Sequence, residues 1–421
     1  MRTAVVVGAG VGGLAAAGAL ARSNWHVTLL ERGDRLRGNG AALLIWPNGV
    51  AALQALGLSL GDIAFPMVAG GIRRPDGRWL VQADVAPLDG APADGAQPLP
   101  TAGGGPSYQA GPHQQSVVVH ADDLHDALMA GLGEKIEIRT GVEVTTVRAG
   151  TAERPAVGTG KHTFEADLIV AADGSRSAIR RRLAPQSAVT SAGYTSWRAV
   201  IPWYRAPKLA ETVPAAGELL GAGHRFLHAA LGGRGTSGGS TRGGIYWVAT
   251  APGAVRPEAL ATQLTLLRRW FADWQAPVGE LLEATEPEDL VQQAGEELRP
   301  LPRRFSFPVG AGGFVLLGDA AHVATPTLTQ GACLAFEDAA TLRSLLRDAR
   351  PGETLPLALD EYTLARRERV ARVAKTSRRL GLVMQARGRL TVRARDTWLE
   401  RVSPRLLDRA AASAHQWTPP P

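Results

Sequence analysis

The chain has 421 residues, a formal net charge of +7 and 45% hydrophobic residues. Its length predicts two packed domains with a helical tail, and its hydrophobic content excludes a wholly disordered chain. Although the chain is basic, its sequence contains no zinc-finger spacing, basic-zipper heptad or single-strand-binding signature, so we expect no nucleic-acid partner.

The sequence also bears on membranes and compartment. It contains no uninterrupted apolar run of about 18 residues, which argues against stable membrane insertion. The apolar segment 2–21 resembles a signal peptide only superficially, because glycines at positions 8, 10, 12 and 13 break such a helix. Cys333 is the single cysteine, so no disulfide forms within the chain, and a reducing cytoplasm is the simplest compartment.

The N-terminal part predicts a strand–helix–strand unit, with strands over 3–7 and 27–31 and a helix over 11–22. Two short strands within 71–82 flank the turn sequence Pro75-Asp76-Gly77. Residues 86–116 are rich in Pro, Gly, Ala and Gln and read as a long loop, either a mobile lid or a disordered insertion.

The pattern changes at about residue 190. Before it we expect a helix and three strands, over 121–132, 136–139, 142–148 and 167–172. After it come longer aromatic strands up to 251 with a hairpin loop at 232–244, two helices within 257–285, a buried strand over 313–317 and a helix over 330–348. Residues 353–413 read as helical and Arg-rich, broken at Pro404. This order predicts an α/β fold: a Rossmann-like nucleotide-binding domain, an inserted β-sheet substrate domain and C-terminal helices.

The first chemical motif is Gly8-x-Gly10-x-x-Gly13, which follows a strand and opens a helix. Its glycines permit a tight turn, a close approach of a pyrophosphate and close helix–sheet packing. Glu31 ends the second strand, where its carboxylate can accept a hydrogen bond from a ribose hydroxyl. This context predicts a dinucleotide site, with a solvated strand-end charge as the alternative for Glu31.

Two further motifs follow buried strands. The second is Asp173-Gly174-x-x-Ser177-x-x-Arg180, for which a capped strand-to-helix turn is the structural alternative. The third is Gly318-Asp319-Ala320-Ala321-His322, which continues to Pro326, Gln330-Gly331 and Glu337-Asp338. A bare nucleotide fold does not need a carboxylate at 319, whereas the ribityl hydroxyls of a flavin can donate to one. The three motifs together predict FAD.

In this order and spacing, over roughly residues 3–345, the motifs resemble the single-component flavoprotein aromatic hydroxylases of the para-hydroxybenzoate and salicylate hydroxylase type. The segments Ile45-Trp46-Pro47-Asn48-Gly49 and Gly193-Tyr194-Thr195-Ser196-Trp197-Arg198 are similar to the branch with FAD-dependent urate and salicylate hydroxylases. The resemblance implies a discontinuous FAD-binding domain (1–75, 110–185 and 300–345), a substrate domain (76–109 and 186–299) and a C-terminal helical region (346–421).

The resemblance also implies roles for single residues. It places the adenosine and pyrophosphate of FAD on Gly8, Gly10, Gly13, Glu31 and Arg32. It places the ribityl chain on Gly318 and Asp319, and the edge of the flavin ring on Pro326 and Gly331. Asp173 and Gly174 would serve both FAD and NAD(P)H. It implies no metal. This chain departs from the family pattern at two positions: Ala121 stands where the family has an Arg that contacts FAD, and Thr329 stands where the family prefers Gly.

The implied reaction uses NADPH or NADH and O2 to hydroxylate an electron-rich aromatic or N-heteroaromatic small molecule, in secondary metabolism or aromatic catabolism. We expect the protein to be a monomer or a homodimer. Arg198 is the candidate catalytic residue, as an anchor for an anionic or carbonyl oxygen; its alternative is a strut of the sheet. Strand alternation places Tyr194, Ser196 and Arg198 on one face. His224, His228, Tyr246 and Trp247 either face the ring or serve structure, and His322 suggests packing.

Two questions stay open. Another flavin reaction on the same fold, such as epoxidation or isoprenoid reduction, is a rival, as is a flavin-binding protein that shields an intermediate; Ala121 and Thr329 favour the latter. Halogenation is disfavoured because Trp197 to Pro202 does not match the Trp-x-Trp-x-Ile-Pro signature of flavin halogenases.

The Arg-rich C-terminal helices read as a solvated face with an apolar stripe on the core, with a dimer or membrane surface as the alternative.

Overall fold

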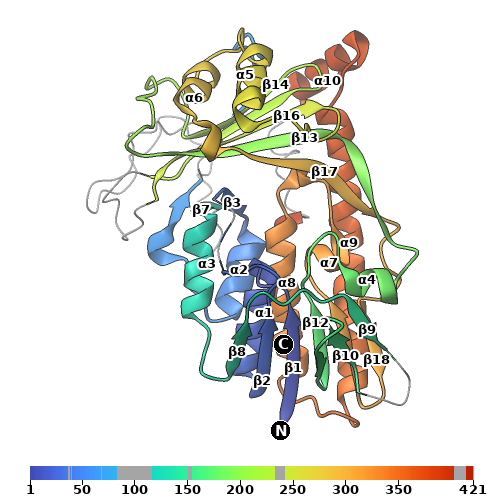
Figure 1. Ribbon diagram of the computed structural model, residues 1–421. Helices are drawn as coiled ribbons and strands as arrows, with labels where there is room; N and C mark the ends of the chain where they lie inside the picture. The colour runs from blue at the N-terminus through green and yellow to red at the C-terminus, as the bar shows by residue number, and fades with distance from the viewer. Residues whose placement is uncertain are drawn as a thin grey trace, which may run out of the picture.

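The computed structural model describes residues 1–402 and 414–420, apart from 37, 39, 68, 83–115, 150–153 and 233–241. Two large sheets, one in each half of the molecule, organise these residues (Figure 1). The long helix α9 (Leu355–Met384) runs along both halves (Figure 1). The loop expected over 86–116 falls almost wholly outside the described residues, as does the break expected at Pro404.

The first sheet has six strands in the order β18-β19-β12-β1-β2-β8. Its centre is parallel: β1 (Arg2–Val7) pairs with β2 (Trp25–Leu30) and with β12 (Leu168–Ala171), and β12 pairs with β19 (Gly312–Leu316). β8 (Ile136–Arg139) and β18 (Ser306–Val309) form the edges. The apolar strands pack with α1 (Val11–Arg22) and α8 (Gly331–Leu346) in one core. This confirms the predicted Rossmann-like unit.

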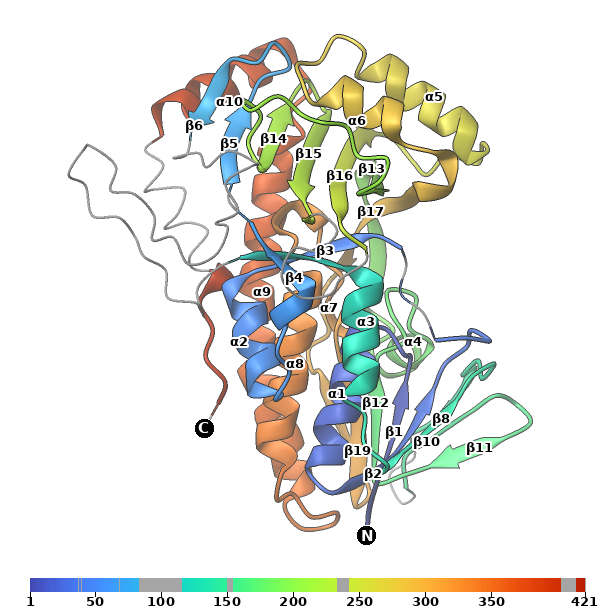
Figure 2. The same ribbon diagram turned by 90° about the vertical axis from the view of Figure 1, so that its left-hand side faces the viewer.

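The second sheet has seven strands in the order β17-β13-β16-β15-β14-β5-β6. Its strands are β5 (Ala69–Arg73), β6 (Trp79–Gln82), β13 (Ala188–Pro202), β14 (Ala216–Leu220), β15 (Arg225–Ala230), β16 (Gly244–Pro252) and β17 (Val291–Arg299). Helices α5 (Leu260–Trp270) and α6 (Val278–Ala284) cover its outer face, where Trp197, Phe226 and Trp247 are buried with Phe271 (Figure 2).

Smaller elements complete the fold. A three-stranded sheet of β3 (Ala42–Ile45), β4 (Ala64–Pro66) and β7 (Val117–His120) lies between the two large sheets (Figure 2), and β9 (Thr146–Arg148), β10 (Ala156–Gly158) and β11 (Thr163–Glu165) form another. Further helices are α2 (Pro47–Ala55), α3 (Ala121–Ala130), α4 (Ala178–Leu183), α7 (Asp319–His322) and α10 (Arg389–Arg401).

Three features of the structure go beyond these expectations. The boundary after residue 75 separates β5 from β6, but these strands pair antiparallel at the edge of the second sheet, so that sheet takes its first strand from before the boundary. The C-terminal helical region breaks at 385–388, between α9 and α10, where Gly388 stands before the first residue of α10. The Arg-rich helix α9 is not simply a solvated face, because Arg366 and Arg369 are buried against α8.

Candidate functional site

The glycine turn between β1 and α1 has no room for side chains at two positions. A Cβ atom on Gly8 would lie 2.3 Å from the carbonyl oxygen of Ala172, and one on Gly13 would lie 1.9 Å from that of Gly8. Gly8 also has a φ of +101°, which favours glycine. Gly10, the residue before α1, faces open space, since a Cβ atom there would have no other atom within 4 Å. The turn therefore presents bare backbone and a helix N-terminus to any ligand.

Glu31 holds this turn together. Its two carboxylate oxygens accept hydrogen bonds from the backbone N–H of Ala9 (2.8 Å) and of Gly33 (2.9 Å). The adjacent Arg32 is exposed. Because each carboxylate oxygen has two lone pairs, Glu31 retains acceptor capacity for a ribose hydroxyl while it braces the turn.

The second motif caps α4 and clamps the third motif. Asp173 accepts from the backbone N–H of Ala178 at 2.8 Å through Oδ2. Its other oxygen is buried and has no hydrogen-bond partner among the described residues. Arg180 donates to the carbonyl oxygens of Asp319 (3.3 Å) and Ala320 (3.2 Å), so the two motifs that follow β12 and β19 are joined side by side.

Asp319 begins α7 and faces a cavity of about 380 Å³ between the two large sheets. The side chain of Asp319 is exposed to the cavity, but the walls of the cavity surround its carboxyl group with protein. This burial raises the pKa of Asp319, while His322, Arg180 and Arg198 act in the opposite direction. Gly10, Gly13, Gly174, Gly318, Pro326, Gly331 and Arg198 line the same cavity. The lining residues in the described part of the chain do not include Gly8, Glu31, Arg32 or Asp173.

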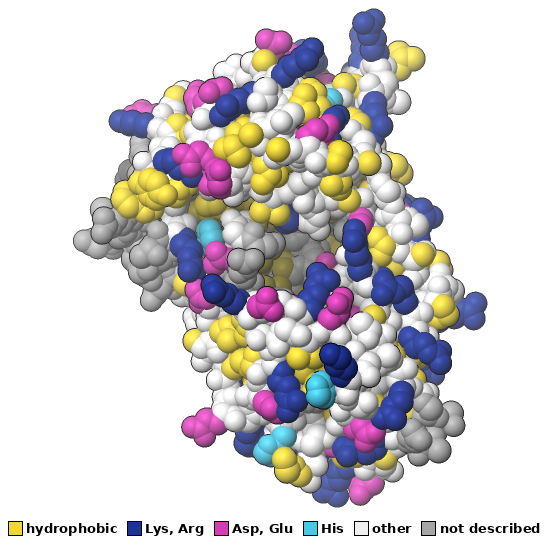
Figure 3. Space-filling view, in the orientation of Figure 1, with side chains coloured by type: hydrophobic (Ala, Val, Ile, Leu, Met, Phe, Trp, Pro, Cys, Tyr) yellow, Lys and Arg dark blue, Asp and Glu magenta, His cyan; other side chains and the backbone are white. Residues whose placement is uncertain are grey.

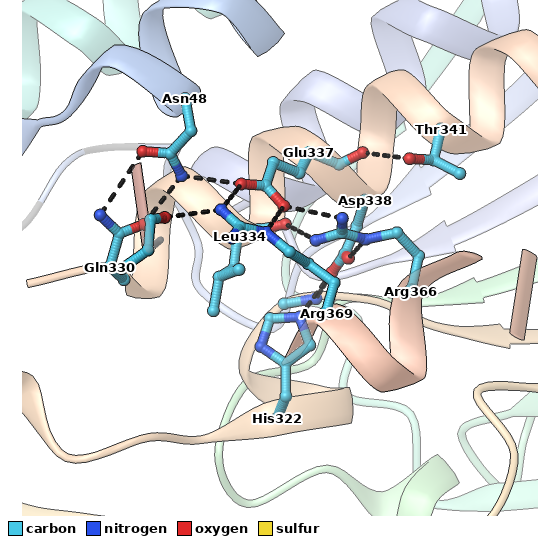
Figure 4. A network of polar contacts seen from close by, with 11 residues as sticks. Asn48, His322, Gln330, Leu334, Glu337, Asp338, Thr341, Arg366 and Arg369 are labelled. Carbon is cyan, nitrogen blue, oxygen red and sulfur yellow. Dashed lines mark hydrogen bonds and ion pairs between the residues drawn. The ribbon is translucent and has the colours of Figure 1, made fainter. Parts of the chain in front are cut away.

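A buried ion network supports the third motif from behind (Figure 4). Glu337 and Asp338 on α8 pair with Arg366 on α9 at 2.7 and 2.6 Å, and Arg369 also binds Glu337. The second oxygen of Asp338 accepts from the backbone N–H of Gly318 and contacts Nε2 of His322 at 2.6 Å. Burial acts to raise the pKa of Asp338, but His322 and Arg366 outweigh it and lower the pKa. His322 therefore belongs to this buried polar network behind the third motif.

The segment from Pro326 to Gly331 keeps its turn without the glycine that the family prefers. Thr329 takes the left-handed conformation itself, with φ 50° and ψ 30°. This conformation costs a non-glycine residue roughly 1–2 kcal/mol. The hydroxyl of Thr329 accepts from the indole of Trp46 and donates to the carbonyl of Leu328, so the side chain is tied down at the cavity wall.

The sheet side of the cavity is lined by alternate residues of β13, as the alternation predicted: Tyr194, Ser196 and Arg198 face it, while Trp197 and Ala199 are buried beneath α5 and α6. Arg198 donates to the side-chain oxygen of Gln293 on β17. Its Nε is buried without a partner in the described part of the chain. The phenol of Tyr246 lies next to this guanidinium. Burial raises the pKa of Tyr246, although Arg198 acts in the opposite direction.

Other candidates lie elsewhere. His224 is half-buried beside Phe271, His228 donates to the backbone carbonyl of Pro214 on the sheet's other face, and Trp247 is in the outer core. Ala121 is buried at the start of α3, where its N–H donates to Ala41. Gln293 and Arg225 also line the cavity, although the sequence patterns did not single them out. Strand alternation on β15 and β17 was the signal that could have found them, once those strands were recognised.

These features define a class of protein. The glycine turn before α1 and the motifs of Asp173 and Asp319 meet at a cavity beneath a second, largely antiparallel sheet. A Rossmann-like domain in this arrangement is typical of two-domain flavoproteins. The chain belongs to the FAD binding domain family, whose model matches residues 1–377. It is 30% identical to the aurachin C monooxygenase/isomerase of Stigmatella aurantiaca, over 99% of this chain and 98% of that protein. It is 32% identical to the 3-amino-4-hydroxybenzoate 2-monooxygenase of Streptomyces cremeus, over 89% and 86%.

Similarity to solved structures agrees with this assignment. The structure of Klebsiella pneumoniae HpxO with FAD and uric acid superposes with a TM-score of 0.75, at 25% identity, over 98% of this chain and 96% of that one. The chain is also 29% identical to an FAD-dependent urate hydroxylase of the same organism. The protein is therefore an FAD-dependent monooxygenase that uses NAD(P)H as co-substrate.

The residues present fit FAD. Open space at Gly10, the N-terminus of α1 at the cavity wall and the unpartnered oxygen of Asp173 among the described residues are the features that a bound dinucleotide would use. When bound, FAD supplies the redox chemistry and the reaction with O2. No helix among the described residues is long and apolar enough to cross a membrane.

Proposed function

We propose that the enzyme hydroxylates a small, electron-rich aromatic or N-heteroaromatic ring that carries an anionic or carbonyl oxygen, and that Arg198 anchors this oxygen. The guanidinium of Arg198 carries the proposal. It lines the cavity and hydrogen-bonds the neutral Gln293, and within the described ranges it has no carboxylate partner. Because no carboxylate among the described residues pairs with it directly, this partly buried cation favours a ligand oxygen with negative charge.

Tyr246 supports the same placement. Its raised pKa keeps the phenol protonated near neutral pH, so it can donate a hydrogen bond beside Arg198. A substrate oxygen between these two groups would receive two donors from β13 and β16. Apolar side chains of the cavity wall, Leu44, Leu227 and Val248, would hold the ring.

The names of the relatives support this substrate class. Urate, 3-amino-4-hydroxybenzoate and 3-hydroxybenzoate, which these names give, all contain rings that carry oxygen substituents. In the proposed reaction the chain's own residues bind the ring, hold its oxygen and keep bulk water from the reacting atoms. Arg198 would also stabilise the ionised form of a ring hydroxyl, which makes the ring more electron-rich.

For the cofactor, we assign the pyrophosphate of FAD to Gly8, Gly10 and Gly13, and its adenosine ribose to Glu31, with Arg32 close by. Gly318 and Asp319 would meet the ribityl chain, Pro326 and Gly331 the ring edge, and Asp173 and Gly174 both FAD and NAD(P)H. The open turn at Gly10 and the exposure of Asp319 to the cavity support these assignments. We also propose a cytoplasmic monomer or homodimer; its free, buried Cys333 is in keeping with a reducing compartment.

The anchor is tested by Arg198→Met, which keeps much of the side-chain volume and removes the charge. We expect a strongly raised KM for the substrate, or NAD(P)H oxidation uncoupled from hydroxylation, with a normal FAD content. Arg198→Lys should recover part of the loss, because it restores the charge without the planar fork. Loss of FAD or of solubility in Arg198→Met would identify a structural strut, and wild-type kinetics would refute the anchor.

A further inference from the structure

Helix α10 (Arg389–Arg401) has two faces of different character. Its inner face carries Leu399, which is buried with Leu80 and Leu220 beneath the edge of the second sheet. Arg395 lies on the same side, where it donates to the carbonyl oxygen of Gly221 at 2.8 Å. The helix is therefore fixed to the protein on this side, next to β6 (Figure 2).

The outer face is apolar and exposed. Leu390, Ala394 and Trp398 recur every four residues and so form one stripe along the helix. Leu390 is 83% exposed and Trp398 is 45% exposed. Together with Arg393 and Arg401 they line a groove on the surface. A fixed helix that presents a leucine and a tryptophan to solvent in this way marks an interaction surface.

Cations surround this stripe. Arg389, Arg393 and Arg401 are all exposed. The two carboxylates of α10 are engaged by other arginines: Asp396 by Arg395 (2.8 Å) and by Arg74 (3.8 Å), and Glu400 by Arg78 (3.1 Å). The stripe therefore combines apolar side chains with positive charge that the acidic residues of its own helix do not neutralise.

We propose that the outer face of α10 docks on an anionic lipid surface, with Leu390 and Trp398 entering the headgroup boundary and Arg389, Arg393 and Arg401 facing lipid phosphates. An aromatic and an aliphatic side chain within a basic face are the composition of interfacial helices. The helix stands at a corner of the molecule, where basic and hydrophobic side chains lie together on the surface (Figures 1 and 3). This association is peripheral and independent of the substrate assignment.

The test is flotation of the full-length, FAD-loaded protein with phosphatidylcholine vesicles that contain or lack phosphatidylglycerol. We expect the protein to float with the anionic vesicles at low salt, to be released at high salt, and to stay behind with the neutral ones. Absence of flotation with anionic vesicles, or equal flotation with both, would overturn the proposal.

Two double variants separate the apolar and the basic parts. L390S/W398S and R389E/R393E should each reduce vesicle binding at least about tenfold. The matched controls are Leu364→Ser, which is 76% exposed on α9 beside the exposed acids Glu361 and Glu368, and Arg372→Glu on the same helix. Melting temperature and FAD content should stay unchanged in all four, because none of the substituted side chains is in the core.

Size-exclusion chromatography with light scattering distinguishes a lipid surface from a second copy of the chain. The proposal predicts the same mass for the wild type and for L390S/W398S. A wild-type dimer that this variant dissociates would show that the outer face of α10 is a subunit interface instead, and would overturn the lipid assignment. Equal vesicle binding by the wild type and both double variants would do the same.

Discussion

The indole nitrogen of Trp46 donates a hydrogen bond of 2.7 Å to the hydroxyl of Thr329, and so ties the start of α2 to the turn before α8. The ring of His415 stacks on the same indole, with centroids 4.1 Å apart and an angle of 14° between the planes. Thr329 is held in a left-handed conformation at the cavity wall. The bond therefore stabilises a turn whose left-handed conformation at residue 329 favours glycine.

Trp46→Phe should weaken FAD binding by about 1 kcal/mol, the usual contribution of one hydrogen bond, because the turn beside the proposed ring site loses its tether. Fluorescence titration of the apoprotein with FAD measures this change. Trp203→Phe, at the half-exposed Trp203 in the substrate domain, is the control and should bind FAD normally. Equal affinities in the two variants would mean that the tether does not position the turn.

Asp319→Ala should weaken FAD binding by roughly 1–3 kcal/mol, the scale of a lost charge-assisted hydrogen bond. Asp319→Asn should lose less, since its amide oxygen still accepts. Arg180 binds the backbone carbonyl of residue 319, so both variants keep the clamp between the second and third motifs. Unchanged FAD affinity in the Ala variant would show that the carboxylate does not reach the cofactor.

Asp338→Asn should lower the free energy of unfolding by about 3–5 kcal/mol, because it leaves Arg366 with an incomplete set of buried partners. Chemical denaturation measures the loss. Since the pKa of Asp338 is lowered in the folded protein, its stabilising contribution is complete above the ordinary value of 3.8 and disappears as the pH falls below it. A loss of less than about 1 kcal/mol would show that the network is dispensable.

Stability should also fall between pH 6.5 and 4 through His228. Burial lowers the pKa of its imidazole from 6.5 to about 4, so the unfolded chain binds the proton more readily within this window. The neutral, folded form is therefore favoured above pH 6.5 and loses up to about 3 kcal/mol by pH 4. His228→Leu should flatten this part of the stability profile, and the exposed control His162→Gln should not. Parallel profiles for His228→Leu and the wild type would contradict the prediction.

The sequence predicted what local patterns and strand order determine. Gly8, Gly174 and Gly318 follow parallel strands, and the carboxyl ends of parallel strands meet at one edge of a sheet, so their convergence could be foreseen. The period of two along β13 placed Arg198 on the cavity face and Trp197 on the other. Both inferences needed only short-range regularity.

The missing parts depend on contacts between distant segments. β5 and β6 read as a hairpin, but nothing local shows that β5 pairs with β14, which lies far along the chain. Arg366 and Arg369 looked like solvated residues because their carboxylate partners lie on another helix. The same holds for Gln293, whose position beside Arg198 depends on the pairing of β13 with β17.

The central claim is that this flavoprotein transfers one oxygen atom from O2 to an aromatic or N-heteroaromatic ring. The most direct measurement is mass spectrometry of the products formed under ¹⁸O₂ from a panel of phenols, indoles and hydroxylated N-heterocycles, with NADH and NADPH in parallel. We predict that at least one ring gains a single ¹⁸O atom in step with the oxidation of one equivalent of NAD(P)H. If NAD(P)H is consumed but no ring in the panel gains the label, or the product takes its oxygen from water, the enzyme does not transfer oxygen from O2 to such a ring.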